Sequence, residues 1–233
     1  MTTGQNIKPS KSRHVGLAGY PVGFSMEAEK MNNDAMIYRA RSFEHLKMLR
    51  DFSNQVFVNH LTLYQGYVKN GNQLATQLMT MVKLGKAGTM EYAELKRRFG
   101  WEFSGMRLHE YYFESHTVTA TALDRQSQLY SKIAQDFGGY DLWKQRFKGT
   151  EGMRGIGWVI LAYDIQARRL FNAWLEEHDA GLLVDALPLL VMDMFEHAFL
   201  PDYRLKRQEY VEAFFNVIDW GRVEKWLADR LRT

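Results

Sequence analysis

Residues 188–203 read PLLVMDMFEHAFLPDY and hold the spacing that says most about this 233-residue chain. An apolar run typical of a strand leads into Asp193, and His197 follows four residues later. If the turn after Asp193 is helical, side chains at i and i+4 project from one face, so a carboxylate and an imidazole converge on one point. A helix-capping aspartate beside a core histidine would give the same letters, so the pair alone leaves both interpretations open.

The composition limits what such a point could bind. The chain has no cysteine, which excludes disulfides, thiolate nucleophiles and cysteine-based zinc or iron–sulfur sites. Any metal must therefore be held by nitrogen and oxygen ligands. The net charge of +3 is too small to indicate nucleic-acid binding. The histidines available are His14, His45, His60, His109, His116, His178 and His197.

Hydrophobic periodicity predicts helices in the first half of the chain. Residues 1–35 show weak periodicity and contain glycine, proline, serine and asparagine, which indicates an N-terminal extension. From residue 42 to about 82, apolar and aromatic side chains recur at helical spacing. Glycines interrupt this pattern, and shorter helices are predicted over 89–98 and, after Gly105, over 106–116. We expect residues 36–122 to form a helical hairpin domain.

The second half, residues 123–233, predicts a domain that mixes strands and helices. Strand-like runs at 158–163, 170–175 and 187–192 are separated by charged, turn-like stretches. Amphipathic helices precede these runs, and further helices follow Asp193. The expected fold class is α+β: a helical hairpin, then a domain with a small three-stranded antiparallel sheet and helices.

Nothing in the sequence indicates a membrane. No stretch is apolar over the roughly 20 residues that a membrane span needs. The first residues are polar and glycine-rich, without the apolar core of a secretory signal. We therefore expect no membrane partner, no nucleic-acid partner and, by default, a cytoplasmic location.

The segment at 188–203 resembles the D-x-W-E-H-A-Y signature of the iron/manganese superoxide dismutases. Tyr203, Arg207, Tyr210 and Ala213 fall at the family's usual spacing, and Asp219 and Trp220 close the motif. Upstream, GIGW at 155–158 is similar to the family's G-S-G-W, and DFGGYDLWKQRF at 136–147 is similar to its D-F-G-x-x-D-x-x-K-x-x-F helix. The resemblance covers about residues 38–233. It implies conversion of superoxide to dioxygen and hydrogen peroxide at one iron or manganese ion per chain.

The metal ligands that the resemblance implies are His60, His109, Asp193 and His197. His109 lies in RLHEYYFE, which resembles the family's N-H-x-x-Y-W segment. The family's first ligand lies eight residues before the tyrosine of a Y-V-x-N motif, but here Asn59 has that place and His60 lies seven residues before Tyr67. We choose His60 because imidazole suits iron better than an amide does. In addition, i and i+7 nearly eclipse on a regular helix, whereas the longer spacing would need a bulge.

Three histidines and one carboxylate would leave a place for a solvent ligand, which the family tunes with a further side chain. Most members use a glutamine from one of two positions, which here hold Gly105 and His178. Some members, notably archaeal ones, have histidine at the second position, so the resemblance implies His178 in this role, with a pH dependence. Tyr67, with Tyr64 as a further candidate, is expected to line the substrate entrance. His178 and Tyr67 are thus the candidate catalytic residues.

The resemblance also predicts what surrounds the ligands. Phe113 and Phe195 replace two family tryptophans and keep an aromatic wall, and Trp158 ends the GIGW segment. Phe199 stands where the family has a tyrosine that pairs with a first-helix histidine, so that pairing is lost. Glu196 matches a glutamate that reaches the ligand histidine of a second subunit, which implies a homodimer or a dimer of dimers.

Other functions stay open on the sequence. The shortened first-helix spacing and the lost pairing would also suit a catalytically altered family member with a structural or interaction role. A non-haem iron oxygenase would use two histidines and one carboxylate, and the third histidine argues against it. Residue identity does not choose iron over manganese; we lean slightly to iron, since the histidine variant occurs in iron-using and metal-flexible members.

Overall fold

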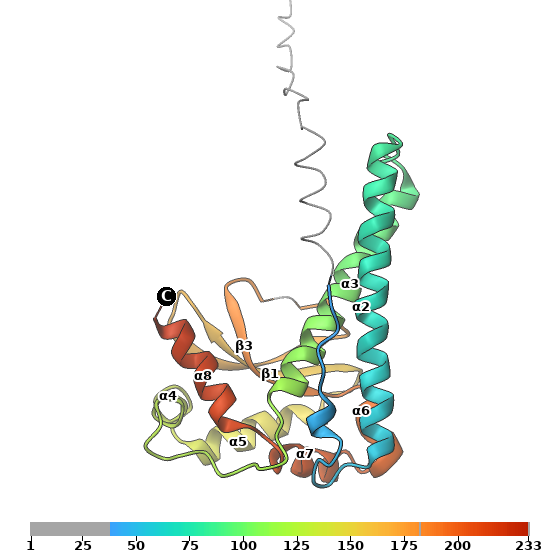
Figure 1. The fold of residues 1–233 in the computed structure, drawn as a ribbon. Coiled ribbons are helices and arrows are strands. Elements are labelled where there is room, and N and C mark those ends of the chain that lie inside the picture. Colours follow the sequence, from blue (N-terminus) through green and yellow to red (C-terminus); the bar gives the residue numbers. More distant parts are fainter. Residues whose placement is uncertain (1–37, 182, 233) are drawn as a thin grey trace, which may run out of the picture. The chain divides into compact units, whose positions relative to one another are not determined.

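The structure is a computed structural model that describes residues 38–181 and 183–232. The predicted extension over residues 1–35 lies outside the described residues. Within them, two long helices are followed by two shorter ones, a three-stranded antiparallel sheet and three further helices (Figure 1). The expected α+β class, with its small sheet, is confirmed.

The first part is a helical hairpin. It consists of the short 3-10 helix η1 (Glu44–Leu46) and the long helices α2 (Asn54–Lys83) and α3 (Met90–Glu114). Each long helix begins at a side-chain cap, where the Ser53 or Thr89 hydroxyl accepts a hydrogen bond from the backbone N–H three residues on. α2 buries a stripe that includes His60, Tyr64 and Val68. This stripe packs mainly against α3, and α2 also contacts α6.

Two boundaries predicted for this half are wrong. The helix predicted from residue 42 begins only at Asn54, because the backbone turns at Asp51, where φ is +66°. The break predicted at Gly105 is absent, and α3 continues through that residue. A glycine inside a helix costs only about 1 kcal/mol, and the packing of α3 against α2 and the sheet outweighs this cost.

The second part is built on a sheet with the order β2-β1-β3, in which β1 pairs antiparallel with both neighbours. Its strands are β1 (Gly157–Asp164), β2 (Arg169–Glu176) and β3 (Ala186–Asp193). The helices before the sheet are α4 (Gln128–Phe137), α5 (Tyr140–Gly149) and the short η2 (Thr150–Gly152). Those after it are α6 (Glu196–Tyr203), α7 (Arg207–Phe215) and α8 (Trp220–Leu231). All three predicted strands are confirmed, each one residue short at both ends.

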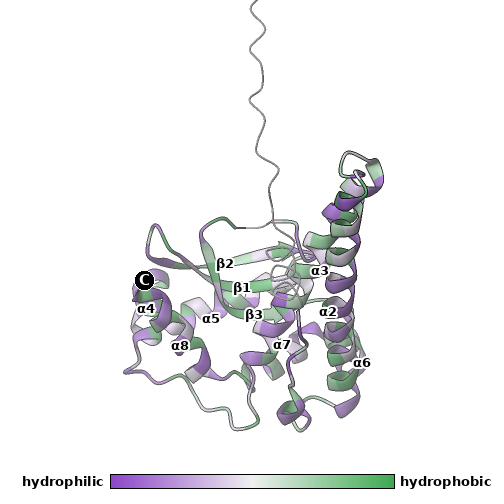
Figure 2. Ribbon diagram, turned by 45° about the horizontal axis from the view of Figure 1, so that its top comes forward, coloured by the Kyte–Doolittle hydropathy of each residue, from purple (hydrophilic) through white to green (hydrophobic). Residues whose placement is uncertain are grey.

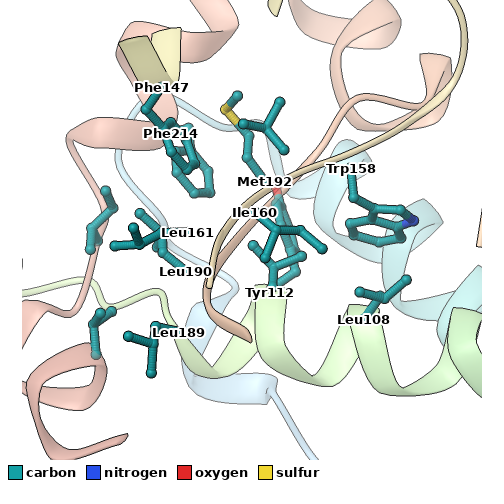
Figure 3. Packing of buried hydrophobic residues seen from close by; sticks show 14 of the residues in the cluster. Leu108, Tyr112, Phe147, Trp158, Ile160, Leu161, Leu189, Leu190, Met192 and Phe214 are labelled. Atoms are coloured by element: carbon teal, nitrogen blue, oxygen red, sulfur yellow. The ribbon is translucent and has the colours of Figure 1, made fainter. Parts of the chain in front are cut away.

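The core lies between the sheet and the helices packed on it. The central strand β1 is buried over residues 157–163, and Figure 3 shows its side chains together with those of β3 and α3. α3 packs against β3, and α4 packs against β2. The strands are hydrophobic along most of their length, whereas α2 has long hydrophilic stretches (Figure 2). This packing places α3, near its C-terminal end, against β3, close to the last residue of that strand.

No helix in the part of the chain that the structure describes is long and apolar enough to cross a membrane.

Candidate metal centre

Four side chains from separate elements meet at one point. His60 comes from α2, His109 from α3, Asp193 from the end of β3 and His197 from the first turn of α6. Their donor atoms, one from each residue, all lie within 4.8 Å of one another. The first three side chains are buried, and that of His197 is 22% exposed. The structure thus brings together the four residues that the sequence nominates as ligands.

Asp193 lies at the centre of the cluster. Its Oδ2 atom is 3.0 Å from His60 Nε2 and 3.1 Å from His197 Nε2. Its Oδ1 atom accepts a hydrogen bond of 2.8 Å from the backbone N–H of Phe195. This second bond orients the carboxylate, so that one oxygen is used by the backbone and the other faces the histidines.

The convergence of Asp193 and His197 has a different cause from the helical turn that their spacing suggests. Asp193 is the last residue of β3, and Phe195 has extended backbone angles (φ −70°, ψ 152°) before α6 begins at Glu196. The helical explanation is therefore wrong. A strand end and the first turn of the following helix bring the two side chains to the same point.

His109 supplies the clearest test of whether a metal fits. Its Nδ1 atom lies 2.6 Å from the backbone carbonyl of Gly105 and donates to it, which leaves a lone pair on Nε2. That Nε2 atom is buried, has no hydrogen-bond partner among the described residues, and lies 3.8 Å from Asp193 Oδ2. A buried polar atom without a partner costs free energy. A metal bound there would remove that cost, so the donor set fits a metal held by nitrogen and oxygen.

Burial and neighbouring charges favour the metal-binding protonation state of three of these side chains. Burial lowers the pKa of His60, and burial together with nearby His60 lowers the pKa of His109 well below its ordinary value. Burial alone would raise the pKa of Asp193, but His197 and His60 outweigh it and hold that pKa well below its ordinary range. The cluster therefore presents two neutral imidazoles and an ionised carboxylate, which are the forms that bind metals.

The first-helix candidates, His60 and Asn59, are clearly distinguished by position. α2 is α-helical from end to end, without the bulge that the longer spacing would need. His60 is 2% exposed and points into the cluster, whereas Asn59 is exposed and accepts a hydrogen bond from Gln55 on the outer face. The geometry supports the choice of His60.

His178 lies beside the cluster and joins two other predicted residues. It is 1% exposed, and its Nδ1 accepts a hydrogen bond of 3.1 Å from the Trp158 indole. The neutral ring must then carry its proton on Nε2, which donates to the Tyr67 hydroxyl at 2.7 Å. Burial lowers the pKa of His178 to about 4 and raises that of Tyr67, so both groups are uncharged at neutral pH. The Tyr67 ring in turn packs 5.0 Å from the ring of His109.

Gly105 explains how this pair is accommodated. A Cβ atom at residue 105 would lie 2.8 Å from Tyr67 Cδ1 and 3.0 Å from His178 Cδ2. Any side chain at this position would therefore displace both rings. Of the two positions at which the family places its tuning residue, only the second has room for one here.

The remaining predicted neighbours form a wall around the ligands. The ring centroid of Phe113 is 5.1 Å from that of His60, and the centroid of Phe195 is 5.4 Å from that of His197. Trp158 packs edge-on to His109 at 5.0 Å and is fully buried. Glu196 differs from these residues, because it is exposed at the first position of α6.

Tyr64 does not line an entrance, and that expectation is wrong. It is fully buried. Its hydroxyl accepts a hydrogen bond of 2.9 Å from Arg41 N and donates one of 3.1 Å to Glu110. The Tyr64 hydroxyl thus takes its partners from α3 and from the segment before η1, and none from Phe199. Its role is to connect α2, α3 and the segment before η1.

Two residues near the site had no assigned role at the sequence level. The Trp101 ring lies 4.4 Å from the His178 ring, and its indole donates to Glu177. The Tyr210 hydroxyl donates to the backbone carbonyl of Asp193. Trp101 precedes Gly105 and His109 at steps of four residues, so helical spacing could have placed it on the same side of α3. No local pattern marks the Tyr210 contact, because α7 is separate from β3.

Comparison with known proteins gives consistent matches. The family model described as iron/manganese superoxide dismutases, C-terminal domain, matches residues 125–226. Superoxide dismutase (Mn) 2 of Haloferax volcanii is 32% identical over 179 residues, which cover 76% of this chain and 88% of the relative. Superoxide dismutase (Fe) of Aquifex pyrophilus is 33% identical over 196 residues, covering 81% and 91%. Superoxide dismutase (Fe) of Saccharolobus solfataricus is 30% identical over 167 residues, covering 70% and 79%.

Proposed function

The chain belongs to the iron/manganese superoxide dismutase family and is a superoxide dismutase, and we propose that His60, His109, Asp193 and His197 hold its one metal ion. The observation that carries this ligand set is the buried, unpartnered Nε2 of His109, which faces Asp193 Oδ2 at 3.8 Å. The four intact donors also argue against a catalytically altered relative with a purely structural or interaction role.

The residues of the chain have definable parts in the reaction. Bound iron or manganese supplies the exchange between +2 and +3 states that dismutation requires. Asp193 contributes the only negative charge among the four donors, and the Phe113 and Phe195 rings keep water from the buried side of the site. Hydrogen peroxide carries two protons, so proton donors must lie beside the ligands.

We assign this proton-holding role to the pair of His178 and Tyr67. Because His178 Nε2 donates to the Tyr67 oxygen, the phenolic hydrogen of Tyr67 is free to point toward an oxygen atom in the site. Trp158 fixes the His178 tautomer that makes this possible. His178 would thereby tune the solvent ligand, and Tyr67 would line the path of superoxide.

The experiment for the ligand set compares matched variants of the purified protein. His60→Ala and His109→Ala should lose metal and superoxide dismutation together, while Asn59→Ala should keep both, because Asn59 faces outward. Metal content by elemental analysis and activity toward superoxide are measured on the same samples. If Asn59→Ala loses the metal and His60→Ala retains it, the register of the first ligand is wrong.

The choice of metal is a further part of the proposal, with a slight lean to iron. The relatives are named as iron and as manganese enzymes, so their names do not decide it. Apo-protein reloaded with each ion separately would show which form is active. Activity only with manganese would contradict the lean.

We also propose that the protein is a homodimer, or a dimer of dimers, with Glu196 reaching His197 of the partner subunit. Glu196 is exposed, and no ion pair holds it within residues 38–181 and 183–232. The side chain of His197 is 22% exposed, so a second chain could approach it. Sedimentation of the parent and of Glu196→Ala over a range of protein concentrations tests this. The variant dimer should dissociate at protein concentrations at which the parent remains dimeric. A monomeric parent would refute it.

Two broader expectations belong to the same proposal. Residues 36–122 and 123–233 would be separate structural domains, which limited proteolysis would test by cleavage in the linker between them. The protein would act in the cytoplasm, which fractionation of the source cells would check.

A further inference from the structure

Two buried tyrosines lie beside the ligand cluster, and one of them is hydrogen-bonded to the Asp193 backbone. Tyr210, from α7, is fully buried, and its hydroxyl donates to the Asp193 carbonyl at 2.6 Å. Tyr112, from α3, is 4% exposed, and its phenol lies near enough to that of Tyr210 for each group to shift the pKa of the other. A phenol has one hydrogen, and that of Tyr210 is used on Asp193, so the Tyr210 oxygen is left able to accept a hydrogen bond.

Tyr112 contacts the histidine side of the cluster. The Tyr112 ring centroid lies 4.7 Å from that of His60. Tyr112 follows His109 by three residues on α3, so both side chains face the same region. Figure 3 shows Tyr112 pointing from α3 toward Met192, the residue before Asp193. Tyr112 therefore lies between the helix of one candidate ligand and the strand residue that precedes another.

The bond from Tyr210 falls at the turn between β3 and α6. β3 ends at Asp193, and the chain turns through Phe195 into α6. The N–H groups on either side of this turn are held, because Met194 N donates to Gly157 O and Phe195 N donates to Asp193 Oδ1. Tyr210 holds the carbonyl, and so fixes the peptide plane between Asp193 and Met194. With that plane fixed, the carboxylate has a defined direction.

We propose that Tyr210, supported by Tyr112, is a positioning residue that aims the Asp193 carboxylate at the metal. The proposal rests on the ligand set given above. The proposal places Tyr112 as a donor to the Tyr210 oxygen and therefore predicts a hierarchy: loss of the Tyr210 hydroxyl removes the whole effect, and loss of the Tyr112 hydroxyl removes part of it. A merely structural pair of core tyrosines would change stability without changing how the metal is held.

The test uses Tyr210→Phe, Tyr112→Phe and the double variant, each loaded with iron. Tyr203→Phe is the matched control, because Tyr203 packs 6.0 Å from the Tyr210 ring but gives its hydroxyl to Asp51, away from the cluster. The readouts are the rate of iron release to a chelator and the electron paramagnetic resonance spectrum of the ferric form. Neither readout requires turnover.

The expected result is that Tyr210→Phe releases iron about 10- to 100-fold faster than the parent, as is usual when a group that orients a ligand is lost. Its ferric spectrum should shift. Tyr112→Phe should move both readouts less in the same direction, the double variant should match Tyr210→Phe, and Tyr203→Phe should match the parent.

Two outcomes would overturn the inference, and they differ from each other. If Tyr210→Phe and Tyr112→Phe unfold more easily but keep the parent's release rate and spectrum, the tyrosines are structural only and the ligand set stands. If the parent itself binds no iron or manganese, the ligand set fails and takes the inference with it. Should Tyr210→Phe not fold, Tyr112→Phe still decides, because an unchanged release rate in that variant contradicts the proposed support of Tyr210 by Tyr112.

Discussion

Replacing Gly105 with alanine should disturb the candidate proton-holding pair through a single methyl group. The new Cβ would lie 2.8 and 2.9 Å from two carbons of the Tyr67 ring and 3.0 Å from His178 Cδ2. These distances are well below the 3.5–4.0 Å of carbon–carbon contact. Both rings must therefore shift, and their 2.7 Å hydrogen bond must lengthen or break.

The expected size follows from two opposing terms. Alanine is favoured over glycine inside a helix by about 1 kcal/mol, whereas forcing an extra methyl into a packed site costs about 1–3 kcal/mol. Gly105→Ala should therefore be less stable than the parent by about 0–2 kcal/mol. Gly100→Ala, in the same helix, should be more stable by about 1 kcal/mol, because nothing lies within 4 Å of its added Cβ.

The assay is denaturant unfolding and superoxide dismutation on both variants and the parent. The free energies of unfolding of the two variants should differ by about 1–3 kcal/mol, or about 2–4 °C in melting temperature for each kcal/mol in a chain of this size. Activity should fall in Gly105→Ala only, while its metal content stays at the parent level. Equal stability and equal activity of the two variants would refute the reasoning that Gly105 makes room for His178.

Three further perturbations have defined outcomes. Tyr64→Phe should lower the free energy of unfolding by about 1–3 kcal/mol, because buried Glu110 loses a donor. The metal content should not change. A drop in both stability and metal content would mean that Tyr64 acts at the metal site. His116 is 3% exposed, neither ring nitrogen has a hydrogen-bond partner among the described residues, and burial lowers its pKa to about 3. The stabilising contribution of the neutral His116 ring is complete above the unfolded-state pKa of about 6.5 and is lost as the pH falls toward 3. At pH 5 the loss of unfolding free energy is about 2 kcal/mol. Chemical denaturation of apo-protein at pH 7 and 5 should show this loss in the parent and not in His116→Leu. Removing the metal should lower the free energy of unfolding by about 3 kcal/mol relative to protein with free metal at a hundredfold excess over its Kd. In a calorimetric scan, added metal should not change the melting temperature of His109→Ala.

Local pattern was sufficient where each residue's environment depends on its neighbours in sequence. The strands β1, β2 and β3 were located to within one residue at each end, because a short apolar run bounded by charged turns has few other ways to be buried. The motif residues Asp193, His197 and His109 were likewise nominated from their immediate context. Their role as ligands stays a prediction, and the structure adds that their side chains converge.

Local pattern failed where a competing contact comes from elsewhere in the chain. Gly105 looks like a helix breaker, but the Tyr67 ring of the neighbouring helix occupies the space above it, so a residue without a side chain is needed there. Tyr64 looks like a residue at an entrance, but Glu110 and Arg41 enclose its hydroxyl. In both cases the packing of α2 on α3 overrides the single-helix pattern.

By itself, the sequence determined the class of the fold, the limit to nitrogen and oxygen ligands that follows from the lack of cysteine, and the identity of the residues worth testing. Only the tertiary structure decided that His60 rather than Asn59 faces Asp193, that His178 holds Tyr67, and that Tyr210 supports the Asp193 carbonyl. The physical reason is separation along the chain. His60 and Asp193 are 133 positions apart, His178 and Tyr67 are 111 apart, and periodicity describes only the side of an element on which a residue lies. What that side meets depends on how the elements pack.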